Sequence, residues 1–307
     1  MKAAFFRRYG PPEVLEYGEL PDPVARSGEV LVDIHAASVN AADWKQRAGQ
    51  YPSKVAMPHI PGRDFSGVVA AAGEGARDFR SGEPVFGVCE VPAESAYAEK
   101  IALRQEIVAH KPERFTHAEC AAAGLAALTA LISVEDTLQL KAGETVLIHG
   151  GAGGVAGFAV QLAKHLGARV ISTASAPNHD YVRGLGADVV IDYRAQDFTR
   201  SASGCDAVFD TVGGEVTARS FGVLRPGGRL ASIAGGAQAP ASPRADVTAL
   251  RPNVARSRRH LERVVRLLES GALRLPEISL FPLSQAAAAH RVSEARHLRG
   301  KLVLQVR

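Results

Sequence analysis

The chain has 307 residues, of which 46% are hydrophobic and 22% are charged, and its formal net charge is +4. This length predicts two domains with sizeable cores, and the composition is typical of globular proteins rather than disordered ones. No stretch approaches about 18 uninterrupted apolar residues, so we expect no membrane span. The first residues lack the pattern of a signal peptide, which predicts a cytoplasmic protein.

Residues 1 to 112 show short strands separated by turn signals. The predicted strands are residues 2–7, 14–20, 29–38, 64–72, 83–88 and 95–103. This pattern predicts a mostly antiparallel β domain with little helix, which we assign to residues 1–113.

A nucleotide-binding unit is predicted next. Thr116 and Glu119 form a capping-box signature that begins a helix to about residue 131, and a short helix is expected over 133–138. A buried strand at 146–148, a helix over 155–166 and a strand at 169–173 then form a βαβ unit.

The turn of this βαβ unit matches the dinucleotide fingerprint, as Gly151-x-Gly153-x-x-Ala156. Such glycines let the backbone approach a pyrophosphate at a helix N-terminus. The predicted cofactor-binding residues here are Gly151, Ala152, Gly153, Gly154 and Val155. The alternative is a glycine-rich turn that serves only to pack helix against strand.

The alternation of strand and helix then continues. Strands are expected at 189–192, 207–210, 229–234 and 246–250, and helices at 179–185, 215–224 and 254–270. This predicts an α/β fold, a doubly wound parallel sheet of six strands, in a Rossmann domain over residues 114–271.

The tail departs from that pattern. Residues 276–282 are expected to be irregular or extended, 283–291 a short helix and 301–306 a strand. Because no long crossover helix precedes that strand, we expect it to pair with the first domain, so that residues 272–307 complete it.

Two compositional features suggest no special partner. The basic cluster at 256–259 is typical of a solvated helix face, so we expect no nucleic-acid binding. Cys89, Cys120 and Cys205 match no zinc or disulfide spacing, which predicts reduced thiols.

Several sequence blocks in order resemble one family. They are residues 39–45, 58–69, 122–125, the fingerprint stretch, Phe209-Asp210-Thr211-Val212-Gly213-Gly214, 224–229 and 299–304. Together they resemble the zinc-free quinone oxidoreductase branch of the medium-chain dehydrogenase/reductase superfamily. The resemblance implies a GroES-like first domain, a nucleotide-binding second domain and a substrate cleft between them.

The resemblance also bears on metals. Zinc-dependent relatives carry a Gly-His-Glu where this chain has Gly62-Arg63-Asp64, and the four clustered cysteines of their structural zinc site are absent. Because zinc needs thiolate, imidazole or carboxylate ligands, a permanent cation at Arg63 argues against it. We expect no metal site.

The remaining chemistry is hydride delivery. Without a Lewis acid, oxidising an alcohol is hard, whereas quinones and enones already accept charge onto oxygen. We therefore predict an NADPH-dependent reductase of quinones or activated C=C bonds. One alternative is a dedicated enoyl- or ene-reductase of a biosynthetic pathway, and another is a non-catalytic nucleotide-binding sensor.

The resemblance suggests four candidate catalytic residues. It places Asn40 and Asp43 near the nicotinamide and Tyr51 across the cleft, where its hydroxyl would stabilise an oxyanion. Lys45 is a possible electrostatic stabiliser. Alternatively, Asn40 is a loop-capping amide, Tyr51 a packed aromatic and Lys45 a solvated lysine. Ala126 departs from the family, which often has threonine there.

Further cofactor contacts are expected at strand ends. Val212 lies in the turn 211–214, and Ala234 and Gly235 lie in the turn 233–236. These could also be ordinary strand-to-helix turns.

Cofactor choice follows from the second strand of the unit. Its end, residues 173–176, carries no carboxylate to bind a ribose 2′-OH, which favours NADPH over NADH. The resemblance suggests Ser175, Tyr193 and Arg296 as donors to the 2′-phosphate. It also implies a homodimer through the edge strand 246–250.

Overall fold

The computed structural model describes residues 1–51, 54–236 and 238–307, and it divides into two compact units. Unit 1 comprises Met1–Leu125, Arg256–Val265 and Leu275–Arg307, and unit 2 comprises Ala126–Ala255 and Arg266–Arg274. The predicted boundary after residue 113 precedes the helix α2 (His117–Leu131), whereas the observed division falls inside this helix.

Unit 1 is built from two β-sheets. A two-stranded sheet pairs β1 with β2, and a seven-stranded sheet has the order β14-β15-β3-β4-β5-β7 with β6 also paired to β3. The strands are β1 (Lys2–Phe6), β2 (Leu15–Glu19), β3 (Glu29–Val39), β4 (Asp64–Ala72), β5 (Pro84–Val88), β6 (Lys100–Arg104), β7 (Val108–His110), β14 (Ile278–Pro282) and β15 (Lys301–Gln305).

The central strand β3 shows why this sheet forms. Its buried residues alternate along the first half, with Val30, Val32 and Ile34 fully buried, as expected of a strand with one face on the core. The closing strand β15 runs antiparallel to β3, with Leu302 opposite Val39. The predicted return of the tail to the first unit is therefore confirmed.

One predicted strand of unit 1 was wrong in its bounds, and two short elements were not predicted. The helix α1 (Ala41–Arg47) is one of these, although Asn40 and Asp43 carry its capping signature. The strand predicted over 95–103 is regular only from Lys100, because Glu94 and Ser95 adopt positive φ angles and break it. The three-residue β7 is too short to show a period.

Unit 2 is a parallel sheet with the order β10-β9-β8-β11-β12-β13, which confirms the predicted doubly wound fold of six strands. The strands are β8 (Thr145–His149), β9 (Arg169–Ala174), β10 (Val189–Asp192), β11 (Cys205–Asp210), β12 (Leu224–Ser232) and β13 (Thr248–Leu250). β13 lies at an edge of this sheet, as the predicted homodimer requires. The homodimer itself stays a prediction.

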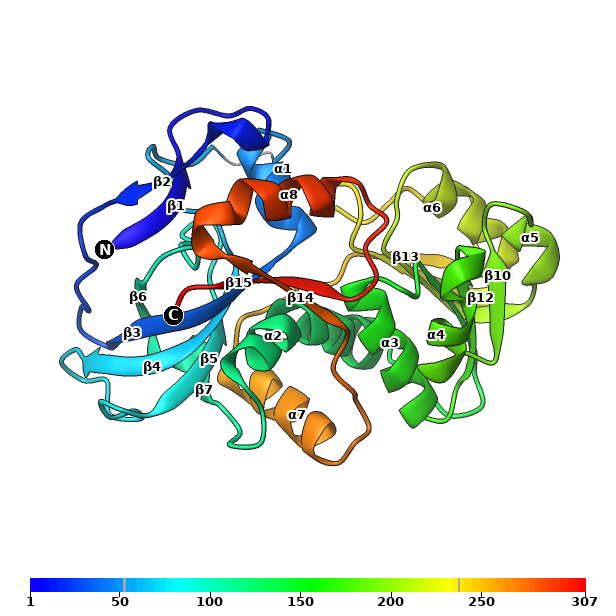
Figure 1. The fold of residues 1–307 in the computed structure, drawn as a ribbon. Helices are drawn as coiled ribbons and strands as arrows, with labels where there is room; N and C mark the ends of the chain where they lie inside the picture. The colour runs from blue at the N-terminus through cyan, green and yellow to red at the C-terminus, as the bar shows by residue number, and fades with distance from the viewer. Residues whose placement is uncertain (52–53, 237) are drawn as a thin grey trace. The chain divides into compact units, whose positions relative to one another are not determined.

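Helices flank the sheet of unit 2. They are α3 (Gly154–His165), α4 (His179–Gly184), α5 (Phe198–Ser201) and α6 (Glu215–Ser220), and Figure 1 shows α3 and α4 on one face of the sheet. The helix α7 (Arg258–Glu269) runs from unit 1 into unit 2, and α8 (Ala286–Glu294) belongs to unit 1.

One helical segment is apolar over an unusual length. Within the described residues, His117–Thr137 has the length and composition to cross a membrane, and it ends in a π-helical turn at Ile132–Thr137. However, 83% of its most apolar window is buried inside the structure. That burial is typical of a core helix, which is apolar on every face because every face packs against protein.

Candidate active site

The glycine turn that follows β8 is the predicted dinucleotide-binding end of unit 2. Gly150 has a φ of +76°, which favours glycine, and Gly153 caps α3 in an extended conformation. A Cβ added to Gly151 would lie 2.3 Å from the Ser172 hydroxyl oxygen, so this glycine is required for packing against β9. A Cβ on Gly153 would meet only the Gly150 carbonyl oxygen, at 3.3 Å.

Neighbouring strands hold this turn in place. The Thr173 hydroxyl accepts from the Gly150 N–H at 3.1 Å, and the Thr211 hydroxyl donates to the His149 carbonyl at 2.8 Å. Burial lowers the pKa of His149 to about 4, so its ring is neutral and serves as a hydrogen-bonding core group. Hydrogen bonds from the ends of β9 and β11 thus hold the turn.

A buried carboxylate that the sequence analysis passed over shapes the next strand end. Asp210 accepts from the backbone N–H groups of Val212 at 2.8 Å and Gly213 at 3.1 Å, and no part of it is exposed. A Cβ on Gly213 would lie 2.8 Å from the Ala234 Cβ. Ala234 is therefore packed against the residue that follows Val212, and Val212 itself is 47% exposed. Gly235, with a φ of +86°, has open space beside it.

The ends of β9 and β10 lie side by side, with Ala174 opposite Asp192 in the register. Ser175 and Tyr193 follow these two positions directly, so the fold brings together two of the three predicted 2′-phosphate donors. The Ser175 hydroxyl accepts from the Asn178 amide at 3.1 Å, and Tyr193 is half exposed.

In unit 1, Asn40 is held between two charged groups. Its side-chain amide donates to Asp64 at 2.9 Å, and its oxygen accepts from the Lys301 ammonium at 2.7 Å. Its backbone N–H donates to Asp43 at 2.8 Å, which completes the N-cap of α1. The orientation of the Asn40 amide is therefore fixed by its partners.

Asp64 and Lys301 are both buried. Asp64 also accepts from the Ser38 hydroxyl at 2.7 Å and the Leu125 N–H at 2.8 Å, and burial raises the pKa of its carboxyl. Burial lowers the pKa of Lys301. A Cβ on Gly124 would lie 2.9 Å from the Asp64 Cβ, so the glycine lets α2 approach Asp64.

Asp43 is fully buried in a second polar cluster. It accepts from the Tyr97 hydroxyl at 3.0 Å, and one of its oxygens lies 3.9 Å from Arg63 Nε. Burial raises the pKa of Asp43 to about 7. The hydroxyl of Tyr97 also lies 3.2 Å from His290 Nε2, and burial lowers the pKa of His290 to about 3.

Arg63 links this cluster to Tyr51. Its Nε donates to Glu94 at 2.8 Å, its Nη1 donates to the Tyr51 hydroxyl oxygen at 3.2 Å, and its Cζ lies 4.6 Å from the centre of the Tyr51 ring. Glu94 in turn contacts His59 Nε2 at 3.0 Å. Sequence reasoning noted Arg63 only as a lost zinc ligand and missed Glu94, which lies 31 residues from it, and His59, which is close to it in sequence but 35 residues from Glu94.

The two remaining predicted cations lie on one aromatic ring. Lys45 Nζ and Arg296 Cζ are each 5.6 Å from the centre of the Trp44 ring, and Arg296 has a φ of +56°. The structure places both in unit 1.

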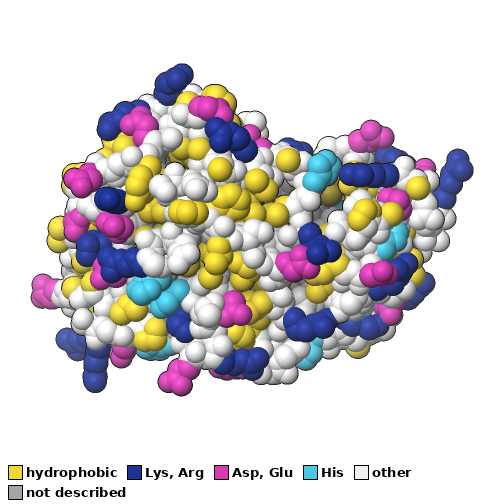
Figure 2. Space-filling model, viewed as in Figure 1, with side chains coloured by type: hydrophobic (Ala, Val, Ile, Leu, Met, Phe, Trp, Pro, Cys, Tyr) yellow, Lys and Arg dark blue, Asp and Glu magenta, His cyan; other side chains and the backbone are white. Residues whose placement is uncertain are grey.

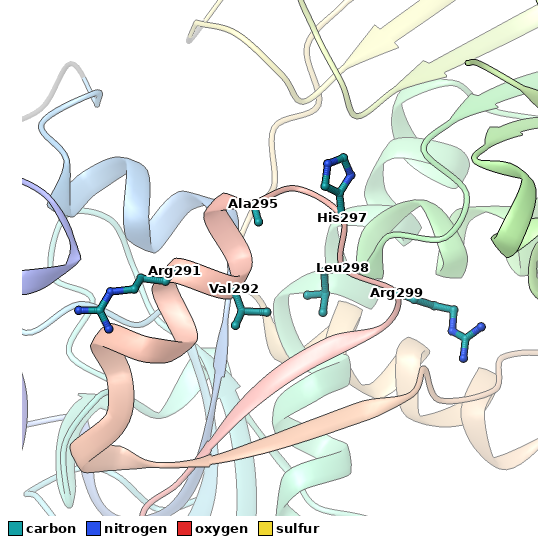
Figure 3. Close-up of a pocket in the computed structure, with 6 residues that line it drawn as sticks. All are labelled: Arg291, Val292, Ala295, His297, Leu298 and Arg299. Atoms are coloured by element: carbon teal, nitrogen blue, oxygen red, sulfur yellow. The ribbon is translucent and has the colours of Figure 1, made fainter. Parts of the chain in front are cut away.

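A surface hollow of about 450 Å³ lies in unit 1, and none of the predicted site residues lines it, although Ala295 and His297, on either side of Arg296, do. Figure 3 shows Val292, Ala295 and Leu298 lining it, with Arg291 and Arg299 pointing away at its two ends. Figure 2 shows hydrophobic side chains grouped over α8 and β14 on the same face. Across the described ranges, no group of three or more His, Cys, Asp or Glu side chains is placed to hold a metal ion.

Two family models match the chain. Residues 26–141 match the alcohol dehydrogenase GroES-like domain, and residues 185–304 match the zinc-binding dehydrogenase model.

Individual proteins are similar over the full chain. The chain is 30% identical to an NADPH-dependent alkenal/one oxidoreductase of Arabidopsis thaliana, over 99% of this chain and 79% of that protein. The structure of the quinone oxidoreductase from Coxiella burnetii is 35% identical, with a TM-score of 0.92 and coverage of 100% and 99%. That of Escherichia coli quinone oxidoreductase complexed with NADPH is 26% identical, with a TM-score of 0.91 and full coverage of both chains.

Proposed function

The chain belongs to the quinone oxidoreductase branch of the medium-chain dehydrogenase/reductase superfamily, and from this premise we propose that it transfers hydride from NADPH to quinones or to the activated C=C bonds of enones. It is a quinone oxidoreductase-like enzyme and an NADPH-dependent reductase. The choice of NADPH over NADH rests on one observation: β9 ends at Thr173-Ala174 and Ser175 follows, without the carboxylate that an NAD site uses.

The residues of unit 2 fit a dinucleotide. Gly153 lies at the N-terminus of α3, where unpaired N–H groups and the helix dipole favour a pyrophosphate. Ser175 and Tyr193 offer hydroxyl groups at the adjoining strand ends, where a 2′-phosphate would need donors. Val212, Ala234 and Gly235 line the strand ends nearer the nicotinamide in this assignment. When bound, NADPH supplies the hydride.

The residues of unit 1 supply polar groups for the acceptor in this proposal. Asn40 presents an amide whose orientation Asp64 and Lys301 fix, so it suits a carbonyl or carboxamide. Tyr51 presents a hydroxyl to the oxygen that gains charge. Asp43 is fully buried and therefore supports α1 and Tyr97 rather than contacting substrate.

The direct test is NADPH oxidation by the purified protein with matched acceptors. We expect turnover with a small quinone and with an α,β-unsaturated ketone, and none with the saturated ketone of the same skeleton. An α,β-unsaturated thioester in the same series tests the alternative, because a dedicated enoyl reductase would reduce it in preference to the quinone. The absence of NADPH oxidation with every acceptor would refute the proposal.

The protein is also expected to work without zinc. By the family resemblance, Arg63 stands where zinc-dependent relatives have a histidine, and a guanidinium that remains protonated cannot ligate a metal. Elemental analysis of the purified enzyme should give far less than one zinc per chain, and incubation with EDTA should leave the NADPH oxidation rate unchanged. Stoichiometric zinc whose removal abolishes activity would contradict this.

Arg296 is proposed as a ligand of the 2′-phosphate. A charge-assisted hydrogen bond is worth about 1.5–3 kcal/mol, so Arg296→Ala should weaken NADPH binding about 10–100-fold. The affinity for NADH, which lacks that phosphate, should stay within about 3-fold of the wild type. Fluorescence titration with both cofactors measures this. An equal loss for both would instead assign Arg296 to packing on Trp44.

A further inference from the structure

We propose that Arg63 is a positioning residue for Tyr51, which it holds so that the phenol O–H is directed to the substrate oxygen that gains charge. This inference rests on the proposed function, because Tyr51 has a substrate oxygen to meet only in a reductase. It adds Arg63 to the site, whereas the family resemblance explains this residue only as a lost zinc ligand.

The first observation is that Arg63 holds Tyr51 in two ways. Its Nη1 donates to the phenol oxygen at 3.2 Å, and its guanidinium lies over the ring, with Cζ 4.6 Å from the centre. Because a phenol has one hydrogen, an oxygen that accepts from Arg63 keeps that hydrogen for another acceptor. A hydroxyl that accepts from a cation is also polarised into a stronger donor.

The second observation is that Arg63 is itself anchored. Its Nε and Nη2 each lie 2.8 Å from the same oxygen of Glu94, whose other oxygen lies 3.0 Å from His59 Nε2. The backbone of His59 exchanges two hydrogen bonds of 2.9 Å with Phe6 of β1. Arg63 is therefore anchored, through Glu94 and His59, to the backbone of β1 rather than to a solvent-exposed side chain.

The third observation is burial. Arg63 is 4% exposed and Glu94 is 2% exposed, whereas Tyr51 is partly exposed at the end of the chain of contacts. A buried ion pair is weak evidence of stabilisation, because desolvation offsets much of the attraction. A guanidinium that directs one edge at a carboxylate and another nitrogen at a phenol is instead suited to orienting the phenol.

A neighbouring charge acts in the same direction. Arg256 donates to the Cys89 carbonyl at 3.2 Å, and burial together with the charge of Arg63 lowers its pKa. Two guanidinium groups therefore lie near Tyr51 and Glu94. Of the two, Arg63 contacts the Tyr51 hydroxyl directly, and a cation at that oxygen favours a substrate oxygen that becomes negative.

The test is a double-mutant cycle between Arg63→Lys and Tyr51→Phe. Lysine keeps a positive charge beside Glu94 but lacks the planar fork that reaches two partners. We expect Tyr51→Phe to lower kcat for an enone about 100-fold, as for loss of one oxyanion donor, and Arg63→Lys to lower it about 10-fold with KM within about 3-fold. In the Tyr51→Phe background, Arg63→Lys should cause no further loss.

A matched control and a binding assay complete the test. Arg258→Lys alters another arginine of unit 1, which donates to the Val108 and Gln105 carbonyls, and it should leave kcat unchanged. Binding of 4-nitrophenolate in the presence of NADP⁺, followed by absorbance, reports the oxyanion contact without turnover. Arg63→Lys should weaken it in the otherwise wild-type protein and not in the Tyr51→Phe variant.

The outcomes separate the two proposals. Equal losses from Arg63→Lys in both backgrounds would make Arg63 structural and overturn the inference, as would a Tyr51→Phe variant with full kcat. If no acceptor is reduced, the proposed function fails, and 4-nitrophenolate binding still decides the role of Arg63. Should Arg63→Lys not fold, Arg63→Met combined with Glu94→Gln, which removes both buried charges, takes its place in the cycle.

Discussion

Replacing Gly153 with valine is expected to weaken NADPH binding by more than about 100-fold while unit 2 stays folded. A Cβ on Gly153 would meet the Gly150 carbonyl oxygen at 3.3 Å, which a shift of a few tenths of an ångström relieves, and nothing else within 4 Å. The Gly153 φ of −77° suits any residue. The added methyl groups would occupy the place of the pyrophosphate. Losing two charge-assisted hydrogen bonds of about 1.5–3 kcal/mol each gives this factor.

Calorimetric titration with NADPH and thermal unfolding measure the two parts of this prediction. The melting temperature should fall by no more than a few degrees, because the helix cap changes by only about 1 kcal/mol. Gly222→Val is the matched control, since a Cβ there meets nothing within 4 Å. If Gly153→Val bound NADPH within about 3-fold of the wild type, the pyrophosphate would not lie at this turn.

Asp43 should make the enzyme less stable as the pH rises. Burial raises the pKa of its carboxyl from 3.8 to about 7 in the folded protein. The folded state therefore binds this proton more tightly than the unfolded state, and the free energy of unfolding falls as the pH rises between these two values. At about 1.4 kcal/mol per pH unit, Asp43 should cost about 3 kcal/mol between about pH 5 and about pH 8.

Asp43→Asn should remove this component, because asparagine does not titrate. Urea unfolding at both pH values is the measurement, and the difference between variant and wild type should move by about 3 kcal/mol in favour of the variant at the higher pH. Asp180→Asn, at an aspartate whose side chain is fully exposed, controls for the loss of a negative charge. Parallel pH dependences of wild type and Asp43→Asn would show that Asp43 is ionised throughout.

The sequence by itself determined the fold of unit 2 and the likeness to a family. Apolar runs, glycines and helix caps are local signals, and they recur in unit 2 at the spacing of a doubly wound sheet. Two features could be predicted from about 10 residues of sequence each: the fingerprint turn and the missing carboxylate after β9. The return of β15 to unit 1 could be predicted from the order of the elements.

Only the tertiary structure decided which polar groups meet. Asp64 contacts Asn40 and lies near Lys301, and Arg63 contacts Glu94 and Tyr51, across separations that no periodic pattern encodes. Such clusters form because a buried charge must find a partner wherever the chain brings one, so their membership depends on the completed sheet. Asp43 shows the consequence: the family resemblance suggests it as a site residue, whereas the structure buries it fully and pairs it with the Asn40 N–H.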